Sequence, residues 1–403
     1  MTRKGNKYLI MIVTFIVTLT AVKAGMTAEL RGTVTTEYRN FIQPPAEEKQ
    51  GSEFLSLSIE PEFYQSWGDN NQSLTVSPFY RWDAQDNQRT HGDIRELFWL
   101  YLSGNYEIVV GISTVFWGVT ESQHLVDIIN QTDFLENIDG EDKFGQAIIS
   151  TTMHMDYGSI ELYALPFFRE RSFPGIIGRL RSIPRVDTNT SAQYESKDKE
   201  QHIDWALRWS TNLDVFDIGI SYFKGTNREP LLTPLLKADG ELVLIPYYAL
   251  IQQTGLELQS VIGAWLWKLE MIYRDSRSDT YTALTGGFEF TYTGALNSSV
   301  DVGLVAEYLY DDRGDKALTP FEDDVMLGIR LSPNDTQNTQ FLLAIIKNRD
   351  AKGHMSRLEA SRRVFDSFTL SIEAGIFVNF KQTDPMYSFR NDDFLQIDMA
   401  YHY

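Results

Sequence analysis

Residues 368–380 read FTLSIEAGIFVNF, and the alternation within this stretch decides the fold. Every second residue, from Phe368 through Phe380, is apolar. The residues between them include Thr369, Ser371 and Glu373, which are polar or charged. Successive side chains of a strand point to opposite faces, so this stretch predicts a strand with one apolar and one polar face.

The same alternation recurs along most of the chain, at 30–38, 55–63, 203–209, 265–273, 300–310 and 397–403. These segments are about 9 to 13 residues long, whereas strands of soluble sheets usually have about 5 or 6. Their apolar faces often end in Tyr, Trp or Phe, which is typical of strands that meet the two interfaces of a bilayer. A soluble β-sandwich remains the alternative. Residues 96–102 are apolar on both faces and receive no face assignment.

The spacing of the segments predicts a closed antiparallel transmembrane β-barrel over residues 25–403. A sheet in lipid leaves no edge unpaired, so the strands must close on themselves. Counting from Leu30 gives about 18 strands, an even number as in bacterial barrels, and 16 stays open. Short connections are expected at 68–72, 103–105, 157–158, 212–214, 262–263, 294–297, 332–338 and 365–367. Long external loops are expected between them, chiefly at 118–145, 169–201 and 224–252.

The first 24 residues have the pattern of a secretory signal peptide. Arg3, Lys4 and Lys7 precede an uncharged apolar run at 8–22, and Val22-Lys23-Ala24 offers a cleavage site. Ala28 is a second choice. A membrane anchor is the alternative, but the apolar run is shorter than the roughly 20 residues that a spanning helix needs. We therefore expect cleavage after residue 24 and delivery to the outer membrane of a Gram-negative bacterium.

Composition narrows the classes of function. The chain has no cysteine, which excludes disulfides, thiolate nucleophiles and thiolate metal sites. Its net charge is −19, and the signal region contributes only positive residues, so the mature chain is more acidic still. Such a chain is a poor partner for nucleic acid. We expect no cofactor and no metal.

Catalytic patterns are weak. Neither an H-E-x-x-H nor a G-x-S-x-G motif accompanies the six histidines. His154 beside Asp156 could be drawn as a dyad, although a strand histidine is more often structural. The turn Asn334–Asn338 lacks the spacing of a calcium loop, and we interpret it as a periplasmic turn. We therefore expect that the protein is not an enzyme. An outer-membrane hydrolase ranks third, after the channel and the structural role described below.

Two long loops carry opposite charge and define the candidate functional site. Residues 117–146 hold one base, Lys143, and seven acids: Glu121, Asp127, Asp133, Glu136, Asp139, Glu141 and Asp142. Apolar residues at helix-like spacing between 125 and 135 predict that this loop folds inward and packs on the wall. Residues 168–185 hold one acid and five arginines: Arg169, Arg171, Arg179, Arg181 and Arg185.

An acidic loop that faces an arginine row across a lumen predicts a pore constriction that filters polar solutes by charge. The alternative is that both loops are solvated, and that their charges bind divalent ions, lipid headgroups or each other.

Six stretches of the chain stand out: VVGISTVFWGVTES (109–122), DIINQTDFLENIDGEDKFGQ (127–146), LPFFRERSFPG (165–175), QTGLELQ (253–259), GAWLWKLE (263–270) and LEASRR (358–363). Together they resemble an uncharacterised family of proteobacterial porin-like outer-membrane proteins. The last strand, which ends on Tyr403, also resembles the C-terminal signal that barrel-assembly machinery reads, with tyrosine in place of the commoner phenylalanine. The resemblance implies a barrel with an envelope role and transfers no substrate or residue role.

We therefore expect a porin-like channel for passive or facilitated passage of small polar solutes, or for export of a polymer. A structural or assembly component of the envelope, with loops that plug the lumen, is the alternative from another class. The expected partners are outer-membrane lipid and lipopolysaccharide, the barrel-assembly machinery and an unidentified small polar solute. A homo-oligomer is an expectation by analogy of fold alone.

Overall fold

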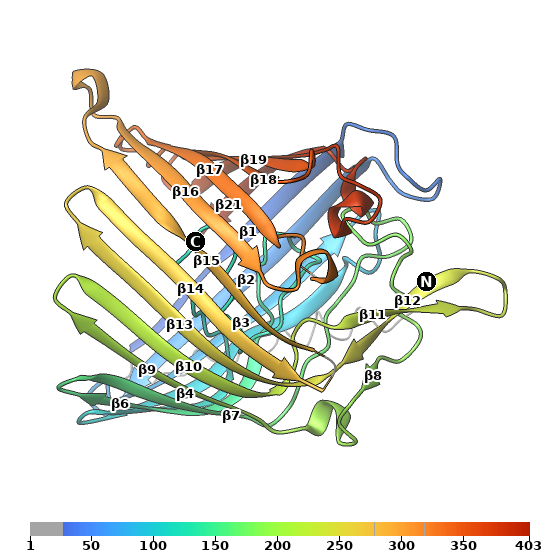
Figure 1. Cartoon of the computed structure of the whole chain (residues 1–403). Coiled ribbons are helices and arrows are strands. Elements are labelled where there is room, and N and C mark those ends of the chain that lie inside the picture. The colour runs from blue at the N-terminus through green and yellow to red at the C-terminus, as the bar shows by residue number, and fades with distance from the viewer. Residues whose placement is uncertain (1–26, 278, 318) are drawn as a thin grey trace.

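The computed structural model describes residues 27–403 apart from 278 and 318, so the predicted signal peptide at 1–24 lies outside the described residues. Within them, eighteen strands form one sheet that closes into a barrel (Figure 1). These strands are β1 (Thr27–Phe41), β2 (Glu53–Trp67), β3 (Gln72–Asp83), β4 (His91–Ser103), β5 (Tyr106–Ser113), β6 (Gln146–Met155), β7 (Gly158–Leu165), β9 (Asp204–Leu213), β10 (Phe216–Thr226), β13 (Leu250–Ile262), β14 (Trp265–Ser276), β15 (Thr280–Tyr292), β16 (Asp301–Asp311), β17 (Asp323–Ser332), β18 (Gln340–Asn348), β19 (His354–Val364), β20 (Phe368–Val378) and β21 (Phe394–His402).

The last strand closes the barrel against the first. β21 pairs antiparallel with β1, from Thr33 opposite His402 to Phe41 opposite Phe394. The backbones of Gly32 and Tyr403 exchange two hydrogen bonds of 3.1 Å, which continue the ladder to the final residue. Closure removes every sheet edge, as lipid requires. The prediction of an 18-stranded antiparallel barrel is confirmed, and the count of 16 is wrong.

The remaining elements lie in the connections. β8 (Gln193–Tyr194), β11 (Leu231–Leu236) and β12 (Leu242–Tyr248) form a small separate sheet, and the β11–β12 hairpin projects beyond the barrel rim (Figure 1). Short 3₁₀ turns occur at η1 (Lys199–Gln201), η2 (Ala295–Asn297), η3 (Gly314–Lys316) and η4 (Pro385–Phe389). In the part of the chain that the structure describes, no helix is long and apolar enough to span a membrane.

Connections at one end of the barrel are short and those at the other end are mostly long. All eight predicted short connections are found, the tightest being two-residue turns at 104–105, 156–157, 214–215 and 263–264. Asp214 and Gly263 adopt φ angles of 59° and 64° there, a left-handed conformation that such turns require. We name three long loops L3 (114–145), L4 (166–203) and L5 (227–249).

The outward face of the wall is apolar, as predicted. Leu30, Leu304 and Leu327 are 53%, 47% and 55% exposed on it. Aromatic rings gather toward the short-turn end, where Trp265 stacks on Trp267 with ring centroids 5.8 Å apart. This arrangement is typical of an interfacial aromatic girdle.

The segment without a face assignment, 96–102, lies next to a bulge. Ser77 of β3 pairs with Glu96 of β4 and Pro78 pairs with Ile94, so β4 carries one extra residue at this point. Ile94 and Leu97 are consequently both exposed, at 40% and 38%, although strict alternation would place them on opposite faces. Beyond the bulge the register is regular, and the pattern could not be interpreted because Phe98 and Leu100, which pair with the inward residues Thr75 and Ser73, are apolar like their outward neighbours.

The inward face is only partly polar. On β16 the buried inward residues alternate between apolar and charged: Val305, Glu307, Leu309 and Asp311. Val305 and Leu309 pack with Met326 of β17 and Ile346 of β18 in one cluster. A barrel of this width is not filled by its own side chains, so this inner surface is left for the loops and for solutes.

Candidate functional site

L3 leaves the wall between β5 and β6 and crosses the barrel interior. Two carboxylates of the far wall, Glu270 of β14 and Glu307 of β16, accept hydrogen bonds from its backbone. Further along L3, Asn137 donates to Glu373 of β20 at 3.0 Å. The loop therefore folds inward, as predicted.

Glu270 is fully buried and acts as the main clamp of L3. Its Oε1 accepts hydrogen bonds from the amides of Val119 and Thr120 at 2.7 and 3.0 Å and from the Thr120 hydroxyl at 2.7 Å. Its Oε2 accepts from the Val126 amide at 3.2 Å. A Cβ on Gly118 would lie 3.0 Å from Glu270 and 2.8 Å from the neighbouring imidazole, so only glycine allows this close approach.

Glu307 forms a second clamp one strand pair further round the wall. Its Oε1 accepts from the Glu121 amide at 2.7 Å, and its Oε2 accepts from the Ser122 amide at 2.8 Å and hydroxyl at 2.6 Å. The Glu121 carboxylate itself bonds to Arg330 of β17 at 2.8 Å and lies 3.7 Å from Lys268 of β14. Neither Glu270 nor Glu307 was among the predicted site residues. Both occupy positions that the alternation of their strands assigns to the inward face.

Apolar residues of L3 pack on the wall without forming a helix, although their spacing is helix-like. Val126, Ile128 and Ile129 are buried in a cluster with residues of β6, β7, β10, β13 and β14. Side chains form hydrogen bonds with backbone N–H and C=O groups that would bond to one another in a helix. Asn130, for example, accepts from the Val115 amide and donates to the carbonyls of Ser113 and Phe144. Such side-chain bonds compete with helix formation.

Two predicted acids, Asp133 and Glu136, tie L3 to β3 and β4. Asp133 bonds to Arg95 at 2.7 Å and to His91 at 3.1 Å, while Glu136 pairs with Arg81. Burial would raise the pKa of Asp133, but His91 and Arg95 outweigh it and hold that pKa below its usual value. His91, Asp133 and Glu136 place ligand atoms within 4.8 Å of one another. Because two arginines already neutralise both carboxylates, this cluster is a poor fit for a metal ion.

The other predicted acids of L3 have separate partners. Asp127 pairs with Lys143 at 2.9 Å within the loop, and Asp139 bonds to Arg357 of β19 at 2.6 Å. Glu141, which is exposed, bonds to His124 at 2.9 Å. Asp142 contributes its backbone carbonyl, which accepts from the Asp133 amide at 2.8 Å.

The five predicted arginines of L4 do not form a row opposite these acids. Arg169 bonds to Asp93 of β4 at 2.5 Å. Arg179, Arg181 and Arg185 tie L4 to other loops through Asp392, Glu47 and Glu241. Arg171 contacts L3, since its guanidinium lies 4.5 Å from the Phe134 ring centroid and its Nε 3.3 Å from Gln131. Arg169 does so too, stacking on Phe144 and donating to the Gly145 carbonyl at 2.8 Å.

Arginines of the wall occupy the place that the sequence assigned to L4. Asp133, Glu136, Asp139 and Glu121 meet Arg95, Arg81, Arg357 and Arg330, respectively. These arginines lie on β3, β4, β17 and β19. The alternation of each strand assigns Arg81, Arg330 and Arg357 to the inward face, and this signal could have identified them from the sequence. Arg95 sits at the bulge, where that signal fails.

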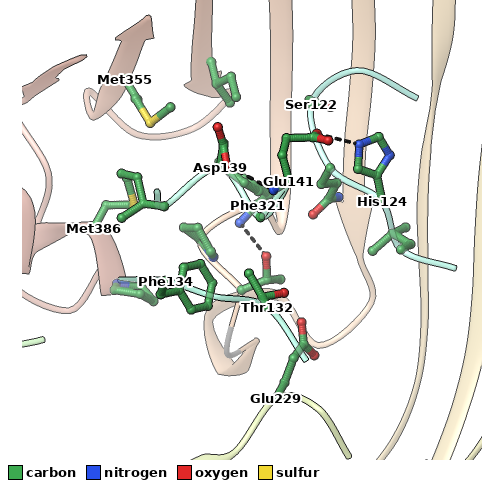
Figure 2. Close-up of a pocket in the computed structure, with 18 of the residues that line it drawn as sticks. Ser122, His124, Thr132, Phe134, Asp139, Glu141, Glu229, Phe321, Met355 and Met386 are labelled. Atoms are coloured by element: carbon green, nitrogen blue, oxygen red, sulfur yellow. Dashed lines mark hydrogen bonds and ion pairs between the residues drawn. The ribbon is translucent and has the colours of Figure 1, made fainter. Parts of the chain in front are cut away.

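A cavity of about 840 Å³ lies between L3 and the wall. Its lining includes Glu121, Asp127, Asp139 and Glu141 of the predicted acids and Arg171 and Arg181 of the predicted arginines. Figure 2 shows Ser122 and His124 toward one side of it, and Met355 and Met386 toward the other. The volume falls within the range of about 300–1,000 Å³ that small-molecule sites occupy. Asp133, Glu136, Asp142, Arg169, Arg179 and Arg185 are not among the lining residues.

His124 links the cavity to the Glu270 clamp. Its Nε2 lies 2.9 Å from Glu141 and its Nδ1 lies 3.6 Å from Glu270. Burial would lower the pKa of His124, but the hydrogen bond to Glu141 and the nearby Glu270 carboxylate outweigh it and raise that pKa to about 10. The imidazolium therefore holds L3 in place at neutral pH.

His154, considered above as part of a dyad, lies near the short-turn end of β6. Its Nδ1 is 2.8 Å from the Ser159 hydroxyl, and neither residue lines the cavity. The turn at 334–338 is a connection of the short-turn end, as predicted, and Asp335 within it accepts hydrogen bonds from the Thr339 amide and hydroxyl.

Comparisons with known proteins bear on the fold. No family model matches the chain, and no curated protein matches it. Among solved structures, it is similar to a BenF-like porin from Pseudomonas fluorescens Pf-5, with a TM-score of 0.54 and 11% identity over 94% of this chain and 98% of that one. A loop-deletion mutant of OmpT, an outer membrane protein of Vibrio cholerae, gives a TM-score of 0.47 at 10% identity, covering 94% of this chain and 100% of that one. A mutant of the Rh. blastica porin gives 0.45 at 11%, with the same coverage. The first of these likenesses shows a shared barrel fold.

Proposed function

We propose that the chain is a porin-like channel of the outer membrane of a Gram-negative bacterium, through which small solutes pass. The observation that carries the proposal is the combination of a closed wall, an apolar outward face and a cavity of about 840 Å³ inside the barrel. An apolar band around a closed barrel is suited to lipid. An interior cavity beside a loop that crosses the lumen is the arrangement expected of a filtered pore.

The filter of this channel is L3 together with the wall arginines. Four acids of the loop meet four arginines of the wall, and Glu121, Asp139 and Arg357 of these residues line the cavity, so fixed charges of both signs face the route where L3 crosses. Rows of fixed charge select solutes by sign and by dipole. The proposed constriction therefore contains several of the predicted L3 acids. Its positive charges come from arginines of the wall strands and from Arg171.

Planar-bilayer recording with the purified protein tests the channel. We expect ion conductance, and liposomes that contain the protein should swell in small sugars. Arg171→Ala should shift the selectivity toward cations, because the cavity lining loses a positive charge. Arg277→Ala, at an exposed loop arginine away from the cavity, is the matched control and should leave selectivity unchanged. Absence of conductance in all preparations would contradict the proposal.

A structural role with a plugged lumen is the second candidate, and the two clamps favour it. Glu270 and Glu307 hold L3 across the lumen through buried hydrogen bonds. A loop held in this way could close the barrel permanently. Wild-type protein that is silent in bilayers, but conducts after L3 is deleted, would support the plug.

Lipid, lipopolysaccharide and the barrel-assembly machinery are the proposed partners. The support is the apolar outward face and the final strand, whose Leu395, Ile397, Met399 and Tyr401 are exposed on that face. Removal of residues 401–403 should reduce the yield of folded barrel in the outer membrane, measured by heat-modifiable migration of membrane fractions.

A further inference from the structure

Four adjacent strands place apolar residues side by side on the cavity wall. Met326 of β17 is the direct cross-strand partner of Ile346 on β18, Ile346 is the partner of Met355 on β19, and Met355 is the partner of Phe377 on β20. We call these four residues the apolar row. All four line the cavity. With strands about 4.8 Å apart, the row extends about 14 Å across the wall.

The loops above the row are also apolar where they meet the cavity. Phe321, Met386 and Phe389 line it, and Met386 packs with Phe377 in one buried cluster. Figure 2 shows Met355 and Met386 toward the same side of the cavity. Met326, Ile346 and Phe377 are at most 9% exposed, so they form a packed apolar boundary of the cavity. Such a boundary offers contact to the apolar body of a solute and no hydrogen bond to a polar one.

The charges that line the cavity are paired, with one exception. Among the described residues, each acid on the lining lies within ion-pair distance of Lys, Arg or His, and the bases other than Arg171 have a carboxylate partner: Lys143, Arg181, Arg228, Arg274, Arg313 and Arg357. The Arg171 side chain donates to Gln131 and to the Arg228 carbonyl, and stacks on Phe134. It is fixed in orientation and forms no ion pair with a described carboxylate; Glu229, the acid whose charge acts on it, is paired with Arg274.

We propose that the cavity binds amphiphilic monoanions, with an alkyl or aryl body along the apolar row and the anionic group on Arg171. This inference rests on the proposed channel and narrows its substrate from small polar solutes to acids with an apolar part. The row lowers the free energy of the body by removing it from water, and Arg171 adds a charge-assisted hydrogen bond. The apolar row thus selects solutes with an apolar body, and Arg171 selects solutes with a negative charge.

Block of the ion current in planar bilayers tests the inference. The probe is octanesulfonate, which stays ionised and does not cross lipid as a neutral acid. Methanesulfonate has the same charge without the body, and octyltrimethylammonium has a similar body with the opposite charge. We expect octanesulfonate to reach half-block at a concentration at least about tenfold lower than either comparison ion. Octyltrimethylammonium lacks the hydrogen bond to Arg171, and methanesulfonate lacks the alkyl chain that burial stabilises.

Two variants separate the contributions of head and body. Arg171→Gln should raise the half-block concentration of octanesulfonate about tenfold and bring it close to that of octyltrimethylammonium. Met355→Gln, a substitution of similar size in the middle of the row, should weaken block by octanesulfonate and leave methanesulfonate unchanged. Arg277→Gln and Ile42→Gln, at exposed loop residues outside the cavity, are the matched controls.

The outcomes distinguish the inference from the proposed function. Conductance with equal block by all three ions would overturn the amphiphile site and leave the channel standing. Absence of conductance would overturn the channel and the inference together. Preferential block by octanesulfonate that survives both Arg171→Gln and Met355→Gln would also overturn the inference, because the ion would then bind elsewhere.

Discussion

The two faces of β16 carry comparable apolar content under different constraints. Outward, Leu304 and Tyr310 are exposed on the surface that we assign to lipid; inward, Val305 and Leu309 are buried within a cluster of the lumen wall. The outward residues need only be apolar, because lipid adapts to their shape. The inward residues must match neighbouring side chains and leave room for L3 and the cavity. Hydrophobicity alone therefore identifies the outer face, whereas the inner face depends on packing.

The largest expected effect comes from a charge on the outer face. Leu304→Arg should lower the free energy of unfolding in lipid vesicles by up to about 4 kcal/mol, because the guanidinium would enter hydrocarbon. Urea titration followed by tryptophan fluorescence measures this. Thr291→Arg is the matched control, because Thr291 pairs with Gly303 beside Leu304 and has inward parity. Equal losses for the two variants would contradict the assignment of the faces.

A smaller effect is expected when the inner face loses its main clamp. Glu270→Ala leaves the buried amides of Val119, Thr120 and Val126 without their acceptor, at a cost of about 1–3 kcal/mol. We expect faster protease cleavage within L3 while the barrel stays folded. Glu270→Gln keeps one acceptor oxygen and should be intermediate. Unchanged cleavage in the alanine variant would show that the apolar contacts of L3 suffice.

The contact of His124 with Glu141 and Glu270 makes the stability of L3, on the inner face, depend on pH. Its pKa is raised to about 10, above the usual value of about 6.5, so its stabilisation of L3 is full below about pH 6.5 and is lost as the pH rises through about 10. Histidine NMR of the detergent-solubilised barrel should show one imidazole still protonated at pH 8.5. The signal is assigned by its absence in His124→Gln. A titration midpoint below pH 7 would contradict the bridge to Glu141 and Glu270.

The smallest effect is expected at a half-exposed ion pair of the lumen. The side chains of Arg330 and Glu121 are 30% and 24% exposed, so water screens their attraction. Arg330→Gln should change the free energy of unfolding by less than about 1 kcal/mol. The same urea titration measures it. A loss as large as that of Glu270→Ala would mean that ion pairs, and not the backbone clamps, hold L3.

Most of the wall could be predicted from sequence, because the strand alternation and turn lengths are local properties. The segment at 96–102 could not, since its inward residues Phe98 and Leu100 are as apolar as its outward ones. The acids of L3 were found from composition, yet their partners were not. Arg81 and Arg357 come from strands that are distant in sequence, and only closure of the barrel places them beside Glu136 and Asp139.

The sequence by itself determined a closed wall of alternating strands and the long loop that folds into it, because alternation and loop length need no knowledge of distant contacts. Tertiary structure decided what faces L3. It assigned four of the five L4 arginines to ion pairs, three of them away from the cavity, and it aligned Met326, Ile346, Met355 and Phe377 into one row. Cross-strand register creates that row, and register follows from how eighteen strands close and not from any one of them.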